Sequence, residues 1–132
     1  MKIFKLLILI AAICTSATAQ WQQQNTPDNT STYVDLEAIS QQIVYCAGQK
    51  MLKTVNGGTT WSPLTIAGYS STVWGISFYN SSTGWGCGFT GKIFKTINGG
   101  GDWTTKTVGT ESFRDILFVN QTTGLVCRDI GR

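Results

Sequence analysis

Short runs of alternating apolar and polar residues, separated by turns, fill the chain from about residue 33 onward. Tyr33 to Ile39 alternates in this way, and Ile43 to Ala47 is a shorter and more apolar run. Met51 to Thr54 and Trp61 to Ile66 follow after further turns. Period-two alternation predicts β-strands, and no stretch has the spacing of a long amphipathic helix. The pattern therefore predicts an all-β chain of short antiparallel strands.

The same order of strands and turns recurs along the chain. Phe78 and Phe118 are 40 residues apart, whereas Trp61 and Trp103 are 42 residues apart. Matched spacing of separate landmarks indicates a structural repeat. Four short antiparallel strands in about 40 residues are typical of one β-propeller blade. The sequence predicts two full blades and part of a third in an incomplete ring, with blade units at about 33–66, 73–108 and 112–132.

Trp21 precedes Trp61 by 40 residues, although no earlier strands accompany it. It stands where the fourth strand of a preceding blade would begin. Propellers avoid exposed sheet edges by closing their ring. We therefore expect residues 21–25 to complete the last blade, within a partial propeller domain spanning 20–132. Because closed rings have at least about four blades, we expect the chain to be the N-terminal part of a longer protein.

The first 19 residues have the pattern of a secretory signal peptide. Two lysines precede an apolar stretch that ends near Ile13, and Ala17-Thr18-Ala19 provides a cleavage site. The stretch is about half as long as the roughly 20 residues of a transmembrane helix. A lipoprotein signal acylated at Cys14 is the weaker alternative. We predict cleavage after Ala19 and a secreted, periplasmic or cell-surface protein without a membrane span.

Composition excludes several kinds of chemistry. The chain contains no histidine, which removes Ser-His and Cys-His nucleophile pairs and His-containing zinc sites. Without Lys2 and Lys5 the net charge is +1, so no long-range attraction to nucleic acid is expected. We expect no cofactor.

Three cysteines follow the signal segment, at Cys46, Cys87 and Cys127. They fall on second strands and are predicted to occupy equivalent places in successive blades. A disulfide needs Cα atoms closer than about 7 Å, and adjacent blades should hold equivalent residues farther apart. We therefore predict three small buried thiols.

A phrase of the form Thr-x-Asn-x-Gly-x-x-Trp occurs twice, between the third and fourth strands of each full blade. The Asn side chains can bond turn backbone groups, and the Gly residues allow positive φ. The Thr hydroxyls can bond locally, and the Trp residues should pack between blades. The turn residues predicted in this way are Thr54, Asn56, Gly58, Trp61, Thr96, Asn98, Gly100 and Trp103.

This phrase resembles the Asp-box, with Asn in the Asp position. Together with Gly84-Trp85-Gly86-Cys87-Gly88 and Lys92-Ile93-Phe94-Lys95-Thr96, it is similar to the repeat of the photosystem II stability and assembly factor family. Such Asp-box or BNR-like repeats also occur in exported bacterial proteins. The resemblance covers nearly all of the chain after residue 19. It implies a β-propeller whose face holds a protein partner, and it specifies fold better than function.

An enzymatic alternative comes from the sialidases and other glycosidases that share the Asp-box. Phe113-Arg114-Asp115-Ile116 is similar to the Phe-Arg-Ile-Pro element of sialidases, but it lacks Pro and follows two Asp-boxes instead of preceding them. Glycosidases also need two positioned carboxylates. Asn56 and Asn98 offer too few charged oxygens for calcium. We expect no metal site and no catalytic residues.

The resulting hypothesis is an exported, non-catalytic propeller module for protein binding or scaffolding. Its candidate partner contacts are the first-strand residues Asp35, Trp74 and Arg114. Tyr69, Trp74 and Tyr79 could also line a groove for a sugar or a peptide. A glycosidase or lectin that acts on carbohydrate is the alternative.

Overall fold

The structure is a computed structural model that describes residues 23–28 and 30–128. These residues form strands and turns without any helix. The strands build two four-stranded antiparallel sheets, in the order β1-β2-β3-β4 and β5-β6-β7-β8, and one sheet of β9 and β10. Their bounds are β1 Tyr33–Ala38, β2 Val44–Gly48, β3 Met51–Thr54, β4 Ser62–Leu64, β5 Val73–Phe78, β6 Gly84–Gly88, β7 Lys92–Thr96, β8 Thr104–Thr107, β9 Phe113–Phe118 and β10 Gly124–Arg128.

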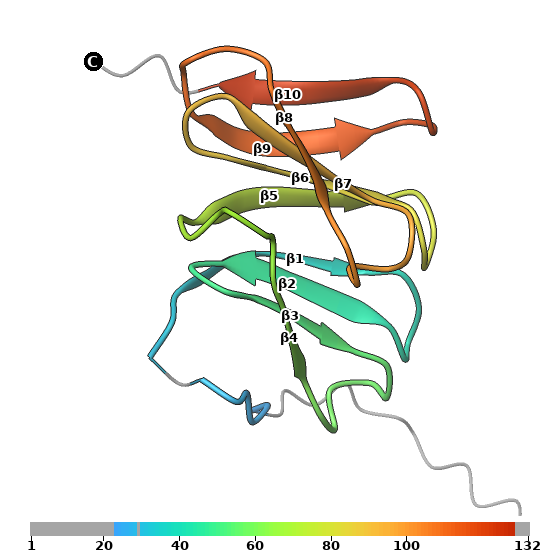
Figure 1. Cartoon of the computed structure of the whole chain (residues 1–132). Coiled ribbons are helices and arrows are strands. Elements are labelled where there is room, and N and C mark those ends of the chain that lie inside the picture. Colours follow the sequence, from blue (N-terminus) through green and yellow to red (C-terminus); the bar gives the residue numbers. More distant parts are fainter. Residues whose placement is uncertain (1–22, 29, 129–132) are drawn as a thin grey trace, which may run out of the picture.

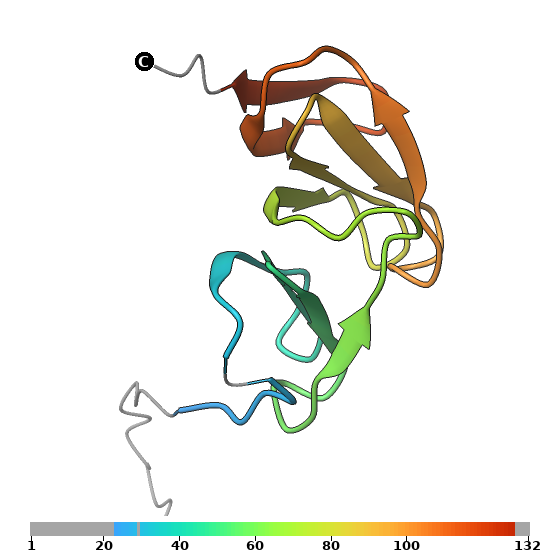
Figure 2. The ribbon, with the colours of Figure 1, turned by 60° about the vertical axis from the view of Figure 1, so that its left-hand side comes forward.

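The three sheets lie one after another, as blades do in a propeller (Figure 1). We call them blade 1 (β1–β4), blade 2 (β5–β8) and blade 3 (β9–β10). Their first strands β1, β5 and β9 run in the same direction, and we call them the inner strands. Figure 2 shows the blades fanned along an arc. The predicted class, an all-β chain of four-stranded antiparallel blades in an incomplete ring, is confirmed.

The first two inner strands share an irregularity near their start. The pairing register shifts between Tyr33 and Asp35 in blade 1 and between Val73 and Gly75 in blade 2. In blade 3 the register shift falls between Cys127 and Arg128 of β10, which pair with Asp115 and Phe113 of the inner strand β9. One extra residue in each inner strand is thus left out of the pairing. A β-bulge of this kind redirects the side chain that it carries. The three bulge residues are Val34, Trp74 and Arg114.

Each Thr-x-Asn-Gly-Gly phrase folds into a hydrogen-bonded turn. In the second turn, the Thr96 hydroxyl donates to Asn98 Oδ1 (3.0 Å) and accepts from the N–H of Gly100 (2.9 Å). The N–H of Asp102 donates to Asn98 Oδ1 (2.9 Å), and Trp103 Nε1 donates to the carbonyl of Gly100 (3.1 Å). These bonds keep the turn's backbone and side-chain polar groups paired without help from a ligand.

The first turn repeats this arrangement. Thr54 Oγ1 donates to Asn56 Oδ1 (2.9 Å) and accepts from the N–H of Gly58 (2.9 Å). The N–H of Thr60 donates to Asn56 Oδ1 (2.9 Å). The two indoles differ, because Trp61 Nε1 is buried without an acceptor in the described part of the chain. Both phrases therefore close a turn through the same Thr and Asn atoms.

Gly100 also accommodates the neighbouring blade. Its φ is 90°, and a Cβ there would lie 2.8 Å from Cδ1 of Leu64 at the end of β4. Gly58 has the equivalent conformation, and the side chain that approaches it is that of Gln24. Gln24 precedes Leu64 by 40 residues. The N-terminal segment therefore meets blade 1 as β4 meets blade 2.

This contact supports the prediction that residues 21–25 act as the outer strand of a preceding blade. Trp21 and Gln22, like the expected signal peptide, lie outside the described residues. Residues 23–25 are described without strand pairing. The closing strand and the predicted domain limits therefore stay predictions.

Stacked aromatic rings join neighbouring blades. Tyr45 of β2 stacks on Phe78 of β5, with ring centroids 3.8 Å apart and an interplanar angle of 15°. Trp85 of β6 stacks on Phe118 of β9 in the same way, at 3.7 Å and 6°. Trp103 meets Phe78 edge to face at 6.2 Å. These rings belong to two hydrophobic clusters, one between blades 1 and 2 and one between blades 2 and 3.

Polar bonds join the inner strands beside these rings. The N–H of Ile76 donates to Asp35 Oδ2 (2.8 Å), and the N–H of Phe78 donates to Glu37 Oε2 (2.7 Å). Between blades 2 and 3, the N–H of Phe118 donates to Ser77 Oγ (2.9 Å). In each bond, a backbone N–H of one inner strand donates to a side chain of the preceding inner strand, 41 residues earlier in the chain. Buried backbone donors need such partners.

The cysteine predictions are partly wrong. Cys46 and Cys87 are buried, as predicted, but Cys127 is exposed because its strand β10 lies at the edge of a two-stranded sheet. Cys46 is also not equivalent to Cys87. Cys87 pairs with Gly75 and Cys127 with Asp115, but Cys46 pairs with Leu36, one residue out of step. A one-residue offset turns a side chain to the other face of the sheet. Burial raises the pKa of the Cys46 thiol to about 11 and that of Cys87 to about 12.

Glu37 makes the stability of the interface between blades 1 and 2 depend on pH. Burial raises the pKa of Glu37 to about 7, with the nearby Asp35 charge adding to the rise and the N–H of Phe78 opposing it. Between pH about 4.3, the usual pKa of Glu, and pH 7, the folded state holds one more proton than the unfolded state. Stability therefore falls as pH rises through this window.

We predict that Glu37→Gln flattens this dependence, because the amide oxygen still accepts from Phe78 but carries no proton equilibrium. One pKa unit corresponds to about 1.4 kcal/mol. Since Glu37 is only half-buried, we expect a loss of about 1 to 2 kcal/mol in the wild type. Urea unfolding of the full-length protein at pH 5, 6, 7 and 8 measures it. Glu111→Gln, at an exposed carboxylate, is the control. Equal pH slopes for wild type and Glu37→Gln would contradict the prediction.

Candidate functional site

The two ends of the blades differ in character. The Asp-box-like turns follow β3 and β7, so they lie at the end where the inner strands finish. The bulge residues lie at the opposite end, where the inner strands begin and where the β2–β3 and β6–β7 turns also lie. We call this second end the bulge face. The predicted turn residues and the predicted partner contacts are thus at opposite ends.

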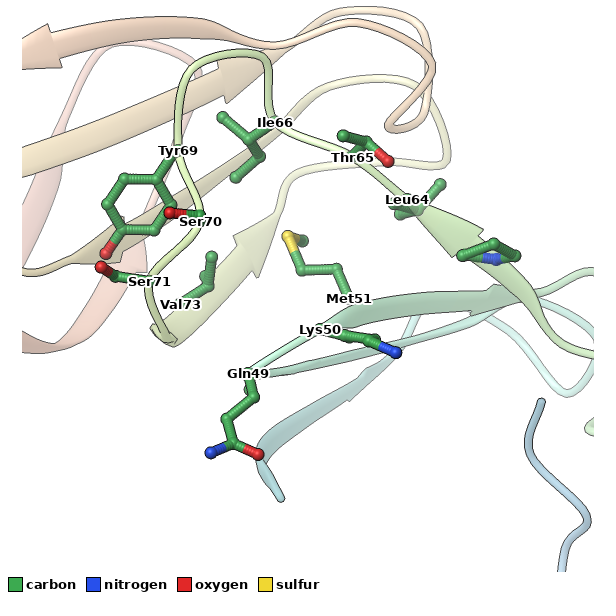
Figure 3. Close-up of a pocket in the computed structure, with 12 residues that line it drawn as sticks. Gln49, Lys50, Met51, Leu64, Thr65, Ile66, Tyr69, Ser70, Ser71 and Val73 are labelled. Carbon is green, nitrogen blue, oxygen red and sulfur yellow. The ribbon is translucent and has the colours of Figure 1, made fainter. Parts of the chain in front are cut away.

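The bulge face contains a pocket of about 350 Å³ between blade 1 and the connection from β4 to β5. Its apolar wall includes Met51, Leu64, Ile66 and Val73, and in Figure 3 Met51 rises from β3 toward Ile66. Polar residues of the β2–β3 turn and of the connection form the rim. These rim residues are Gln49, Lys50, Ser70 and Ser71. An apolar pocket with a polar rim fits one apolar side chain of a larger ligand.

Tyr69 connects this pocket with the start of blade 2. Its ring lines the pocket and packs on Phe94, with centroids 4.6 Å apart. Its hydroxyl donates to the carbonyl of Thr72 (2.9 Å) and accepts from the N–H of Phe89 (2.9 Å). Burial raises the pKa of Tyr69, so the hydroxyl stays protonated near neutral pH. Tyr69 therefore fixes the position of Phe89 from within the pocket wall.

Phe89 belongs to a cluster of one cation and two aromatic rings. The guanidinium carbon of Arg114 lies 4.2 Å from the ring centroid of Trp74 and 5.9 Å from that of Phe89. The two rings meet edge to face, with centroids 5.6 Å apart. A guanidinium over an indole is a favourable cation–π contact. The cluster brings together bulge residues of two adjacent blades and the β6–β7 turn of the first of them.

The backbone beside Phe89 is in an uncommon conformation. Thr90 has a φ of 54° and is exposed, although residues branched at Cβ rarely adopt positive φ. Its hydroxyl donates to the carbonyl of Phe89 (2.8 Å). Strained backbone of this kind is more frequent at functional sites. The turn thus holds Phe89 in place from both sides.

The structure brings together two of the three predicted partner contacts, Trp74 and Arg114. The third, Asp35, is half-buried between blades 1 and 2, where it accepts from the N–H of Ile76 and from its own neighbour Leu36 (2.8 Å). Both of its oxygens already have donors. The contact of Asp35 with a partner stays a prediction, whereas the structure shows that Asp35 joins blades 1 and 2.

Phe89 and the pocket were not predicted from the sequence. Tyr69 was named as a groove aromatic together with Tyr79, but Tyr79 lies at the far end of blade 2, in the β5–β6 turn, and is 50% exposed. The one sequence signal for Phe89 is a bulky aromatic directly before the Thr90-Gly91 turn. The pocket has no local signal, because its walls come from separated segments.

The described carboxylates all have contacts within the chain. Asp35 and Glu37 bind backbone donors between blades, and Asp115 Oδ1 accepts from the N–H of Ile116 (2.8 Å). At the surface, Asp28 pairs with Lys50, Asp102 Oδ2 accepts from Asn98, and Glu111 pairs with Arg128. Residues 23–28 and 30–128 include no group of three or more His, Cys, Asp or Glu side chains suited to a metal ion. Over the same ranges, no helix has the length and apolarity to cross a membrane.

We predict that Tyr69→Phe loosens the β6–β7 turn. The change leaves the N–H of Phe89 without its acceptor, which should cost about 1 to 2 kcal/mol. Amide hydrogen exchange of Phe89 should become faster than in the wild type, and urea unfolding gives the loss of stability. Tyr79→Phe, at an exposed hydroxyl, should change neither. Unchanged exchange at Phe89 in the Tyr69 variant would show that the bond is unimportant.

The chain is similar to solved structures that include the following two, and no family model or curated protein matches its sequence. The first is YCF48 bound to D1 peptide, with a TM-score of 0.75 and 23% sequence identity over 87% of this chain and 39% of that chain. The second is an ancestral GH74 enzyme, with a TM-score of 0.60 and 12% identity over 78% of this chain and 17% of that chain. At these identities the likeness shows the fold alone, and the chain spans about two fifths of YCF48. It has the propeller blades that its resemblance to the photosystem II assembly factor family implies.

Proposed function

We propose that the chain is an exported, non-catalytic propeller module that binds a protein partner at the bulge face. The observation that carries this proposal is the cluster of Arg114, Trp74 and Phe89, held at the junction of blades 2 and 3. Aromatic residues and arginine supply most of the binding energy at protein interfaces. The neighbouring pocket offers room for an apolar side chain of the same partner.

The chemistry of the cluster favours a peptide segment that presents a carboxylate near an apolar side chain. Arg114 is an exposed residue whose guanidinium lies over an indole face, and guanidinium groups bind carboxylates through charge-assisted hydrogen bonds. Tyr69 connects the cluster with the apolar pocket, because it lines the pocket and its hydroxyl accepts from the N–H of Phe89. YCF48, which shares the blade fold, is seen with a D1 peptide. That complex supports a protein ligand as the class of partner.

The carbohydrate-active alternative has less support. A GH74 enzyme shares the fold at 12% identity, but glycosidases need a pair of carboxylates facing the substrate. Asp35 and Glu37 are occupied by backbone donors between blades. Hydrolysis of a panel of glycosidase substrates by the full-length protein would overturn the non-catalytic proposal.

Peptide binding gives the direct test. A random peptide library is selected on the immobilised full-length protein, and the dissociation constants of selected peptides are compared between wild type and Arg114→Gln. We expect at least a tenfold loss, equivalent to about 1.4 kcal/mol. Two control variants, Lys106→Gln and Tyr79→Ala, remove an exposed cation of the outer strand β8 and an exposed aromatic of the β5–β6 turn. Equal losses in all three variants, or no selectable peptide, would contradict the proposal.

Export is the part of the proposal that rests on residues 1–19 alone. If the segment is a signal peptide, the protein recovered outside the cytoplasm begins at Gln20, as N-terminal sequencing would show. A cytoplasmic protein that retains Met1 would contradict it.

A further inference from the structure

We propose that the pocket of blade 1 binds the main chain of a peptide segment of the protein partner, in the place that blade 2 fills with its own β6–β7 turn. One residue of the segment donates its N–H to the carbonyl of Ser71 and accepts from the N–H of Ile66. This mode of binding rests on the proposed function and deepens it, because it names the backbone bonds by which the bulge face holds a peptide.

In blade 2, the β6–β7 turn is bonded to the connection between β8 and β9. Gly91 of this turn donates its N–H to the carbonyl of Glu111 (2.7 Å) and accepts from the N–H of Val108 (2.8 Å). The fit is tight, because a Cβ on Gly91 would collide with the carbonyl oxygen of Gly109. The backbone of a single residue thus closes the gap between the turn and the connection.

The equivalent β2–β3 turn of blade 1 is shorter. Four residues separate Gly48 from Lys53, whereas six separate Gly88 from Lys95. These two pairs of residues have equivalent strand partners in their blades. Blade 1 therefore lacks two residues in the turn that carries Gly91 in blade 2.

The connection that follows blade 1 is correspondingly longer. Trp61 and Val73 are 12 residues apart, whereas the equivalent Trp103 and Phe113 are 10 residues apart. The pocket of about 350 Å³ lies between this longer connection and the shorter turn. It therefore marks the place that Gly91 fills in blade 2.

Two backbone groups at the pocket lack the bonds that their equivalents make in blade 2. Ile66 follows Trp61 as Val108 follows Trp103, and Ser71 stands two residues before its inner strand, as Glu111 does. Ile66 and Ser71 both line the pocket. In the described part of the chain, no hydrogen bond reaches the N–H of Ile66 or the carbonyl of Ser71. One donor and one acceptor are thus available to a ligand.

The β2–β3 turn does not use these groups itself. Gln49 precedes Lys53 by four residues, as Gly91 precedes Lys95. However, the N–H of Gln49 donates to the carbonyl of Thr32 (3.0 Å), and its Oε1 accepts from the N–H of Thr32 (3.0 Å). In Figure 3 the Gln49 side chain points away from the connection. The segment before β1 thus holds the turn apart from the connection.

A peptide segment suits this pocket because each of its residues carries the N–H and C=O that Gly91 supplies in blade 2. Main-chain bonds of this kind are a common way to hold a peptide at a sheet edge. The pocket also has room and an apolar wall for a side chain, which the gap around Gly91 lacks. Lys50 at the rim pairs with Asp28 but is still 58% exposed. This cation favours an acidic segment over a basic one.

Amide hydrogen exchange with a defined probe tests this mode of binding. The probe is the blocked pentapeptide Gly-Phe-Thr-Gly-Glu, which has the sequence of residues 88–91 followed by a carboxylate. At saturation we expect exchange at Ile66 to slow about tenfold, because its N–H becomes bonded. Exchange at Val108, which is already bonded to Gly91, should not change. Unchanged exchange at Ile66, or an equal change at both amides, would overturn the proposal.

Two N-methylated forms of the probe provide the matched control. Sarcosine in place of the second glycine removes the N–H that bonds to Ser71, and should weaken binding at least tenfold, or by about 1.4 kcal/mol. Sarcosine in place of the first glycine should have little effect. Equal dissociation constants for the two forms would contradict main-chain binding. Neither measurement involves Arg114, so a failure here is distinct from a failure of the Arg114→Gln test.

Discussion

Contact between neighbouring inner strands is the constraint on which this structure depends. A four-stranded blade is too thin to bury both of its faces by itself. Here blades 1 and 2, and blades 2 and 3, bury their facing sides together. A stacked ring pair joins each of these interfaces, and side chains of one inner strand accept backbone N–H groups that lie 41 residues later in the chain. The hydrophobic clusters accordingly lie between the sheets. The stability of such a repeat protein depends on the interfaces between neighbouring repeats as well as on each repeat itself.

The candidate site is a product of the same contact. Trp74 and Arg114 are separated by 40 residues and belong to different sheets, and they meet only because blades 2 and 3 are in register. The bulges then turn both side chains out of the regular strand pairing. Tyr69 adds the connection between blades 1 and 2 to the arrangement by holding Phe89. Binding at this face would therefore respond to changes in the interfaces below it.

Most of the fold could be predicted from the repeat spacing, because turns and large aromatic residues recur at fixed intervals along the sequence. Cys46 shows where that reasoning fails. Its distance from Cys87 is 41 residues, one more than the 40 that separates Cys87 from Cys127. A shift of one residue along a strand moves a side chain to the opposite face of the sheet. Cys46 and Cys87 therefore occupy different positions in their blades, although their spacing is close to that of the repeat. The role of Asp35 between blades could not be predicted, because its partner there is the backbone N–H of Ile76, and a backbone group is the same at every position of the sequence. The pocket walls likewise meet only after folding.

Differences between the repeats are as informative as their likeness. The Asp35 side chain lies between the inner strands of blades 1 and 2, and its carboxylate accepts one backbone N–H from each strand. Gly75 provides no such spacer, and a Cβ there would lie 2.9 Å from the Cα of Asp115. The inner strands of blades 2 and 3 therefore approach more closely at this point. Trp74 and Arg114 are the adjacent residues on those two strands, with the guanidinium 4.2 Å from the ring. The absence of a side chain at Gly75 permits the close approach of the two strands beside Arg114 and Trp74. Val34 and Trp74 make no such pair at the other junction, because valine supplies neither a cation nor a ring.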